Sequence, residues 1–216
     1  MTGLTASPRI LKGGLVLLDP DTGLPVRVIS FQYNPDTLTR SLQAQGMGEN
    51  GDRSEALRLK GPAVETIKVE AELDLTDQLE AADATALSSG LHPQLAALEG
   101  MIQPKASVLQ SNNDLASLGT LEIVPAEAPL AVFVWGPSRV VPVRVTEFSI
   151  TEEAFDTNLN PIRAKVSLGL RVLNINDVNF DDAAGRLFMA YLREKERLAG
   201  LATQGTLGSM GVEGVL

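Results

Sequence analysis

The sequence contains no cysteine and only one histidine in its 216 residues. Without cysteine there is no disulfide framework, no thiolate ligand for zinc or an iron–sulfur cluster, and no thiol nucleophile. A single histidine also excludes a histidine-rich metal centre. We therefore expect neither a bound metal nor a cofactor.

Aromatic and basic side chains are also scarce. Aromatic residues make up 4%, and the 18 basic residues are outnumbered by 27 acidic ones, which gives a formal net charge of −9. Binding to nucleic acid or to an anionic membrane requires a basic surface, and stacking on single-stranded nucleic acid requires aromatic side chains. We therefore expect no nucleic-acid partner.

Long apolar runs are missing as well. No stretch approaches the roughly 18–20 apolar residues of a membrane-spanning helix. Residues 1–14 lack the charged start and long apolar run of a signal peptide. We expect a chain that is made in the cytoplasm without a signal peptide and is not inserted into a membrane. Its 44% hydrophobic content is that of an ordinary globular protein.

The sequence offers no convincing catalytic group. His92 stands directly before Pro93 at the start of a predicted helix, where a polar residue near a helix cap is the simpler interpretation. The paired carboxylates Asp19/Asp21 and Asp181/Asp182 match turn and helix N-terminus chemistry. We expect no catalytic residues and no enzymatic activity.

Period-two alternation predicts a mainly antiparallel β protein. The clearest case is 64–75, where Ile67, Val69, Ala71, Leu73 and Leu75 alternate with Lys68, Glu70, Glu72 and Asp74, which is typical of a strand with one wet face. Two apolar runs, 9–19 and 26–33, flank an Asp–Pro–Asp–Thr–Gly turn and predict a hairpin. Further strands are predicted at 130–135, 140–150 and 164–173.

Helices are predicted from Thr76, at 92–102 and at 183–201. The last has Leu187, Tyr191, Leu198 and Leu201 near one stripe and 193–197 on the wet side. The glycine-rich segment 43–63 is predicted to be a flexible loop. The stretch 104–128 is rich in serine, asparagine and proline, and its prolines make it a poor candidate for a central strand. These patterns divide the chain into a β-domain over 1–175, a helical extension over 176–202 and a flexible tail over 203–216.

Three short motifs stand out at predicted strand ends. They are Phe31–Gln32–Tyr33–Asn34–Pro35, then Phe133–Val134–Trp135–Gly136 with the only tryptophan, and the turn 155–164 with Asn160, Pro161 and Arg163. Taken singly, each is typical of a strand terminator, because asparagine and glycine tolerate turn geometry and proline cannot donate to a ladder.

Taken in order, these motifs resemble the tube and baseplate-adaptor proteins of contractile, phage-tail-like injection systems. The resemblance covers about 9–173. It includes the aromatic-x-aromatic-Asn-Pro element at 31–35, Leu73–Asp74–Leu75 before a short helix, and a helix leading into a proline-containing linker at 92–104. It continues with Phe-x-Trp-Gly at 133–136, Val-x-x-Phe-Ser-Ile at 145–150 and Phe155 with Pro161, Arg163 and Ala164.

The resemblance implies an α+β fold that is mainly β, with an antiparallel barrel or sandwich of the phage tail-tube type, a flanking helix and a C-terminal helix. It also implies a homo-hexameric ring that joins the spike or hub to the inner tube, with inner-tube, spike or hub and baseplate wedge proteins as partners. Larger members carry a C-terminal LysM module, where this sequence has only a helix and a tail. The open alternatives are a stacked inner-tube subunit and a soluble ligand-binding β-sandwich.

The candidate interface residues come from the three motifs, the glycine-rich loop and the C-terminal helix. They are Phe31, Tyr33, Asn34, Pro35, Gly46, Gly48, Gly51, Trp135, Gly136, Phe155, Asn160, Pro161, Arg163, Leu187, Tyr191 and Leu198.

Overall fold

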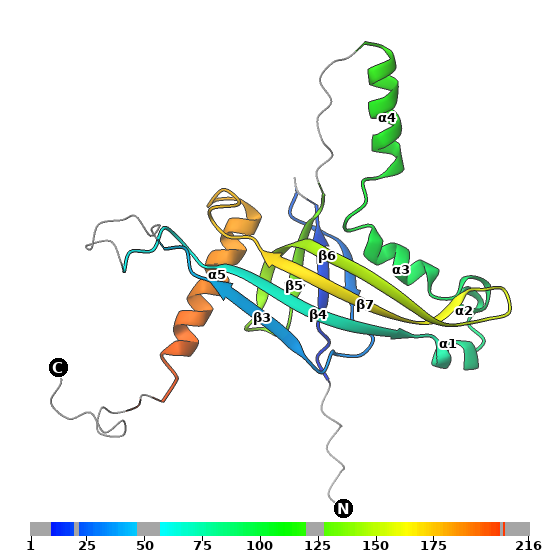
Figure 1. Ribbon diagram of the computed structural model, residues 1–216, viewed down its shortest axis with the longest axis horizontal. Helices are drawn as coiled ribbons and strands as arrows, with labels where there is room; N and C mark the ends of the chain where they lie inside the picture. Colours follow the sequence, from blue (N-terminus) through cyan, green and yellow to red (C-terminus); the bar gives the residue numbers. More distant parts are fainter. Residues whose placement is uncertain (1–9, 20–21, 47–56, 120–127, 204, 206–216) are drawn as a thin grey trace, which may run out of the picture.

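The computed structural model describes residues 10–19, 22–46, 57–119, 128–203 and 205. Within them, seven strands form one sheet in the order β2-β1-β5-β6-β7-β4-β3 (Figure 1), and every neighbouring pair is antiparallel. The strands are β1 Gly14–Leu18, β2 Pro25–Ser30, β3 Leu38–Gln43, β4 Val64–Asp74, β5 Leu130–Val134, β6 Val140–Phe155 and β7 Pro161–Val172. The helices are α1 Thr76–Glu80, α2 Ala84–Ser89, α3 His92–Glu99, α4 Ala106–Ser117 and α5 Ala183–Ala199.

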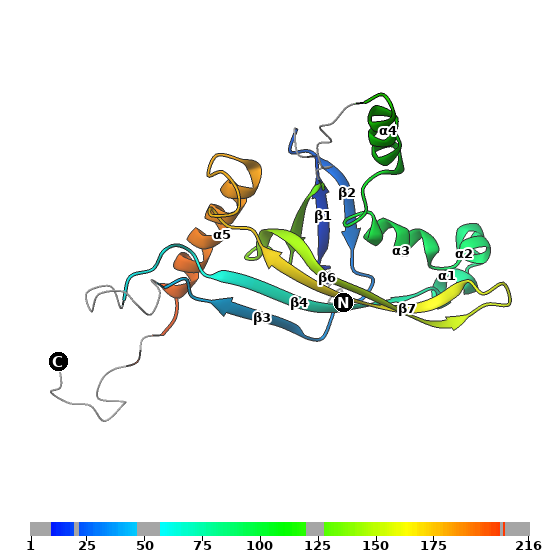
Figure 2. The same ribbon diagram turned by 45° about the horizontal axis from the view of Figure 1, so that its top comes forward.

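The sheet bends sharply at its longest strand. Only the first residues of β6, 140–143, pair with β5, whereas β6 pairs with β7 along nearly its whole length. A register shift between Val145 and Glu147 marks a bulge, which bends a strand and increases its twist. The strands β1, β2 and β5 therefore stand steeply against β3, β4 and β7 (Figure 2).

The core lies on the inner face of the bent sheet. In β4, Ile67, Val69 and Ala71 are buried while the intervening charged residues face outward, so the predicted alternation is confirmed. Leu95 and Leu98 of α3 belong to the same buried cluster. Burial of each large apolar side chain contributes about 1.5–3 kcal/mol, so this face fixes the strand register and positions the polar residues on the other side.

The predicted mainly antiparallel fold, with a flanking helix and a C-terminal helix, is confirmed. β1 and β2 form the expected hairpin, and β5, β6 and β7 cover the three later predicted strands. β6 and β7 both extend into the turn predicted at 155–164, because Phe155 pairs with Pro161. Two short helices, α1 and α2, follow β4, where the sequence predicts only one helix start.

The strand β3 is not predicted from its residue pattern. The stretch 38–43 pairs with β4 from Leu38↔Val69 to Gln43↔Val64. An isolated bridge between Gly46 and Leu59 continues this pairing into the segment predicted as a loop. The central part of that loop, with Gly48 and Gly51, lies outside the described residues.

The stretch 104–128, a poor candidate for a central strand, contains a helix that the sequence pattern does not predict. Residues 106–117 form α4, a helix that stands away from the sheet (Figures 1 and 2). No residue of α4 is buried. The second half of this stretch lies mostly outside the described part of the chain.

The C-terminal helix forms as predicted, but it buries a different stripe. Ala184, Gly185, Phe188 and Tyr191 are its buried residues, whereas Leu198 and Leu201 are exposed. The stripe shifts because Phe188 lies in phase with Tyr191, and both belong to the hydrophobic core cluster. Among the described residues, no helix has the length and apolar character needed to cross a membrane.

Candidate functional site

The outer face of β4, β7 and β6, called here the polar face, carries alternating charges that pair between strands. Lys68 Nζ lies 3.1 Å from a carboxylate oxygen of Glu147, and Lys165 Nζ lies 3.3 Å from Glu153. Arg163 binds Asp74 at 3.0 Å. Each exposed pair stabilises the fold by at most about 1 kcal/mol, so the main effect is to leave little net charge on the polar face.

Gly169 shows how closely this face is packed. It lies in register with Lys68 on one side and with Glu147 on the other. A Cβ on Gly169 would lie 2.7 Å from the Cβ of Glu147, so only glycine lets the glutamate cross β7 to reach the lysine. The Thr146 hydroxyl also donates to the Gly169 carbonyl at 3.1 Å, which holds the bulge in place.

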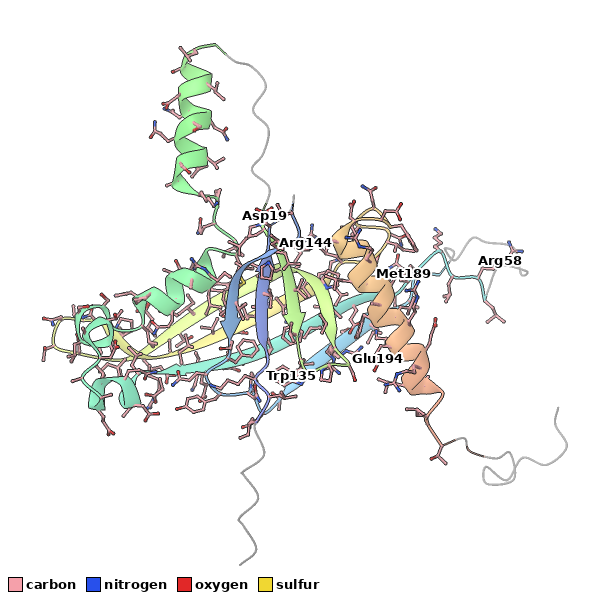
Figure 3. The ribbon with its side chains drawn as sticks, turned by 180° about the vertical axis from the view of Figure 1, so that it is seen from behind. Asp19, Arg58, Trp135, Arg144, Met189 and Glu194 are labelled. Carbon is pink, nitrogen blue, oxygen red and sulfur yellow. The ribbon has the colours of Figure 1, made fainter. Side chains whose placement is uncertain are left out.

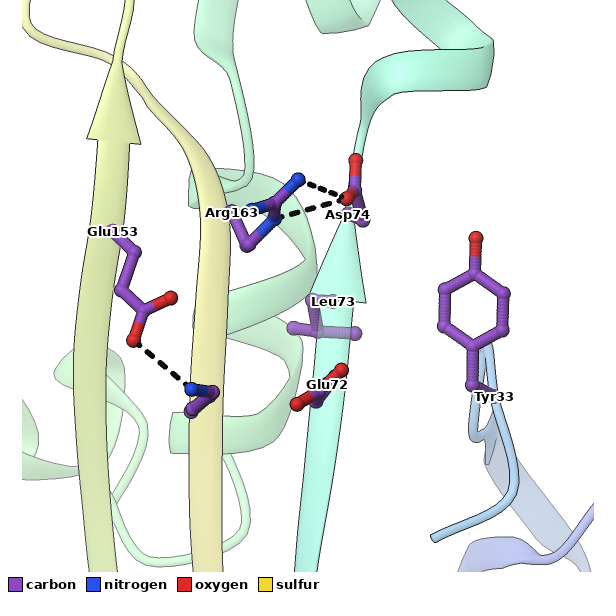
Figure 4. A pocket seen from close by; sticks show the side chains of 7 residues that line it. Tyr33, Glu72, Leu73, Asp74, Glu153 and Arg163 are labelled. Atoms are coloured by element: carbon purple, nitrogen blue, oxygen red, sulfur yellow. Dashed lines mark hydrogen bonds and ion pairs between the residues drawn. The ribbon is translucent and has the colours of Figure 1, made fainter.

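A groove of about 380 Å³ opens at one end of the polar face. Its lining residues are Tyr33, Glu72, Leu73, Asp74, Glu153, Arg163 and Lys165. Figure 4 shows Tyr33 standing across from the β4 residues, with Arg163 bound to Asp74. Hydrogen bonds from the hydroxyl and backbone N–H of Thr76, together with Arg163, lower the pKa of Asp74. The groove brings together two predicted interface residues, Tyr33 and Arg163.

The side chains of the motif at 31–35 have three different environments. One is buried in the core, one is exposed at the surface, and two bind backbone groups. Phe31 is 3% exposed and belongs to the core, whereas Tyr33 is 51% exposed. The Gln32 side-chain amide donates to the Asp74 carbonyl at 2.6 Å and accepts from the Asp74 N–H at 2.9 Å. The Asn34 amide likewise accepts from Gly13 N–H and donates to the Leu11 carbonyl. Gln32 therefore joins the chain that follows β2 to the end of β4.

Replacing Gln32 by glutamate is expected to lower the free energy of unfolding by about 1–3 kcal/mol. A carboxylate can still accept from the Asp74 N–H, but its second oxygen would face the Asp74 carbonyl without a proton to donate. Chemical denaturation followed by Trp135 fluorescence measures the change. The matched control is Gln43→Glu, an exposed position, and an equal loss in both variants would contradict a bridging role for Gln32.

Trp135 belongs to an aromatic cluster at one end of β1 and β5 (Figure 3). Its ring stacks on Phe133 at 5.9 Å and lies 6.4 Å from Phe31 at a tilt. A Cβ on Gly13 would lie 2.5 Å from the indole, so the tryptophan packs directly on that backbone. Gly136 has a φ of +75° in the turn that follows. Two of the motifs thus meet in space, and the cluster fixes the β1/β5 end of the subunit.

The β6–β7 turn is built around Asp156. Its carboxylate accepts from the backbone N–H groups of Asn158 and Asn160, and from the Asn160 side chain at 2.8 Å. These bonds, led by that of the Asn160 side chain, lower the pKa of Asp156. Pro161 is buried, and its carbonyl accepts from the Leu91 N–H at 2.9 Å. The turn is therefore fixed to the α2–α3 connection.

A buried carboxylate that sequence analysis missed anchors α5 to the sheet. Glu65 is 3% exposed and binds Arg40 Nε at 2.6 Å and Lys195 Nζ at 2.8 Å. The Tyr191 hydroxyl lies 3.0 Å from the same carboxylate, and the Lys195 ammonium stands 4.1 Å from the Tyr191 ring centroid. Burial alone would raise the pKa of Glu65, but its bonds to Arg40 and Lys195 hold that pKa below its ordinary value.

A signal for Glu65 was present in the strand pattern. Glu65 stands two residues before Ile67, so the alternation places its carboxylate on the apolar face of β4, where a charge requires partners. The partners lie on β3 and α5, far away in sequence, and only the fold brings them there. Tyr191, a predicted interface residue, is buried in this network.

The remaining interface candidates lie at separate places on the subunit. Phe155 and Leu198 are exposed, Pro35, Asn160 and Leu187 are partly buried, and Gly46 is exposed beside its bridge to Leu59. Gly48 and Gly51 lie outside the described residues. An interface role for all of these candidates stays a prediction.

A family model of contractile injection system tube proteins matches residues 18–178. The chain belongs to this family. A chain from the tail of an empty GTA particle with C6 symmetry has a similar structure, with 12% sequence identity, a TM-score of 0.29, and coverage of 74% of this chain and 90% of that one. No curated protein matches the sequence.

The match gives this chain a structural role as a tube-type protein of a contractile injection system. It spans every strand from β2 to β7 and the polar face with its groove. It ends before α5, so the helix anchored by Glu65 lies outside the matched region.

Proposed function

We propose that this chain is a ring subunit that joins the spike or hub to the inner tube within the baseplate of a contractile injection system. The observation that carries the proposal is the match to the tube family over β2 to β7 of the bent sheet. Following the sequence resemblance, the ring contains six copies, and its neighbours are inner-tube, spike or hub and wedge proteins.

The architecture of the sheet supports assembly into a ring. The terminal strands β2 and β3 pair on one side only in the described part of the chain. Exposed strand edges promote uncontrolled association unless a partner covers them, and a closed ring can cover them with copies of the same chain. The polar face, on which Lys68, Arg163 and Lys165 pair with carboxylates, suits a water-facing wall of such a ring.

The helix α5 lies beyond the matched region. It supports a role at the junction between the spike or hub and the inner tube, rather than a role as one of many identical tube subunits. α5 follows residue 178 and is held to β3 and β4 by Glu65, Arg40 and Lys195. A rigidly attached extra helix gives the ring a feature that the tube-domain match does not include. The alternative is a stacked inner-tube subunit, which the description of the family as a tube protein favours.

A ligand-binding β-sandwich receives less support. The described groove is lined largely by charged side chains, and Arg163, Asp74, Lys165 and Glu153 already bind one another across it. A ligand would have to displace these pairs. A ligand-dependent rise in melting temperature of an isolated monomer would favour this alternative.

Counting copies in purified particles tests the proposal. The chain is tagged in the producing organism, and the particles are examined by electron microscopy and quantitative mass spectrometry. We expect sheathed rods that carry spike and wedge proteins, with a fixed copy number of this chain in each particle. A copy number that rises with rod length would make the chain a stacked tube subunit instead. A lone monomer without partners would overturn both roles.

A further inference from the structure

Near the bend of the sheet, two arginines lie side by side on the polar face. Arg144 of β6 lies directly opposite Arg171 of β7, and both residues are on the polar side of their strands. Like charges that face each other directly destabilise a sheet. Asp177 binds Arg171 at 2.7 Å, whereas no carboxylate binds Arg144 in the described part of the chain. One positive charge, on the exposed Arg144, therefore stays uncompensated.

The groove at the other end of the polar face has the opposite imbalance. Its lining holds three carboxylates, from Glu72, Asp74 and Glu153, and two cations, from Arg163 and Lys165. The two cations bind Asp74 and Glu153. Glu72 therefore keeps its negative charge without a partner among the described residues. The groove has room for one more cation.

Glu72 shares the groove with an exposed aromatic ring. The ring of Tyr33 stands across from the β4 residues (Figure 4), and 51% of Tyr33 is exposed. A guanidinium suits this combination, because it can donate two parallel hydrogen bonds to a carboxylate and lie over the face of an aromatic ring. Both ion pairs of the lining can stay in place, since Glu72 takes part in neither.

Arg144 cannot reach the groove of its own chain. Arg144 lies in register with Arg171, whereas Glu72 lies in register with Lys165. Lys165 and Arg171 are six residues apart on β7, which corresponds to about 20 Å of strand. This separation exceeds the combined length of an arginine and a glutamate side chain. The two sites can meet only between separate molecules.

We propose that the guanidinium of Arg144 in one copy binds Glu72 and the Tyr33 ring in the groove of the next copy. The contact compensates the surplus charge of each site and draws Arg144 away from Arg171. Because both complementary sites lie on one face of the same chain, a second copy satisfies both at once. Each copy offers one arginine and one groove, so the contacts run head-to-tail, as in a closed ring. This inference rests on the proposed ring.

Zero-length cross-linking tests the contact directly. In Arg144→Lys, a carbodiimide can couple the introduced amine to a carboxylate that lies in contact with it. We expect an amide bond between position 144 and Glu72, identified by mass spectrometry after digestion of assembled protein. Arg193→Lys, an exposed position on α5, is the matched control and should give no bond to Glu72. Absence of the 144–72 bond in assembled protein would overturn the contact.

Charge reversal separates this contact from a general effect of charge. Arg144→Glu and Glu72→Arg should each weaken association between copies about tenfold or more, because like charges then face each other. The double variant Arg144→Glu/Glu72→Arg restores the attraction and should associate nearly as well as the wild type in sedimentation velocity. The control Arg144→Glu/Glu99→Arg has the same net charge, but Glu99 is exposed at the end of α3. Equal recovery in the two double variants would refute the proposal.

Two further measurements separate association from folding. Arg144→Glu removes the repulsion from Arg171, so its melting temperature should stay the same or rise. Tyr33→Leu keeps an apolar side chain but removes the ring, and should weaken association by about two- to fivefold. Tyr33→Phe keeps the ring and should leave association unchanged. A lower melting temperature of Arg144→Glu would attribute its weaker association to unfolding and count against the contact.

Native mass spectrometry of the purified chain separates this inference from the proposed function. Rings without the 144–72 bond overturn the contact and leave the proposed ring. Bonded oligomers that do not close into rings support the contact and count against the ring. Monomers without the bond count against both.

Discussion

Replacing Glu65 by glutamine is expected to lower the free energy of unfolding by about 2 kcal/mol. Removing one member of a fully buried ion pair costs about 3–5 kcal/mol. The loss is smaller here because the Arg40 and Lys195 side chains are 27% and 32% exposed and can be hydrated. For a chain of this length the change corresponds to a fall in melting temperature of about 4–8 °C.

Glu70→Gln is the matched control for this variant. It removes the same charge from the same strand, but Glu70 is exposed on the polar face. We expect a change within about 0.5 kcal/mol for the control. If the two variants lose equal stability in urea denaturation, the network around Glu65 does not anchor α5.

The contribution of Glu65 is also expected to depend on pH. Its pKa is lower in the folded protein than in the unfolded chain, so between the two values the unfolded chain binds more protons. The stabilisation is complete above the ordinary glutamate pKa of about 4.3, and it is lost as the pH falls through the folded value. The difference in the free energy of unfolding between the wild type and Glu65→Gln should therefore shrink at acidic pH. Denaturation curves recorded at several pH values measure it. A difference that stays constant down to pH 3 would contradict this mechanism.

Replacing Gly90 by valine is expected to cost about 3 kcal/mol or more. Gly90 has a φ of +53°, a conformation that strains β-branched residues by about 1–3 kcal/mol. A Cβ at this position would also lie 2.6 Å from the carbonyl oxygen of Pro161, and such overlap costs a further 1–3 kcal/mol, roughly. The substitution pushes the α2–α3 connection away from the β6–β7 turn.

Hydrogen exchange of the Leu91 amide locates the damage. This amide donates to the Pro161 carbonyl at 2.9 Å, so its protection should fall together with the free energy of unfolding. Gly136→Ala is the control, because Gly136 also has a positive φ but nothing lies within 4 Å of its would-be Cβ. It should lose only about 1 kcal/mol. Equal effects at both glycines would show that backbone strain, rather than contact with Pro161, dominates.

The sequence alone determined the strands whose two faces differ. In β4 and β7, apolar and polar residues alternate so regularly that a shift by one residue would expose the core. The face of the sheet on which each side chain lies can therefore be predicted from the strand's own sequence. The β1–β2 hairpin was equally readable from its turn chemistry. The order of the short motifs was enough to indicate the tube family that the comparison bears out.

Tertiary structure decided the elements whose residues have no clear pattern of their own. β3 alternates only weakly, and it forms because β4 offers a free edge and because Arg40 reaches Glu65. α4 consists largely of weak helix formers, so pattern and propensity did not identify it.

The links between distant parts of the chain were equally out of reach of the sequence. Glu65 meets Lys195 across 130 positions, and Gln32 meets Asp74 across 42. A polar contact between residues far apart in the sequence produces no periodic pattern near either residue. The bend of the sheet and the position of α5 determine which polar groups come close enough to bind. Alternation thus specified the faces of the strands, whereas the packing of the bent sheet specified which polar groups meet.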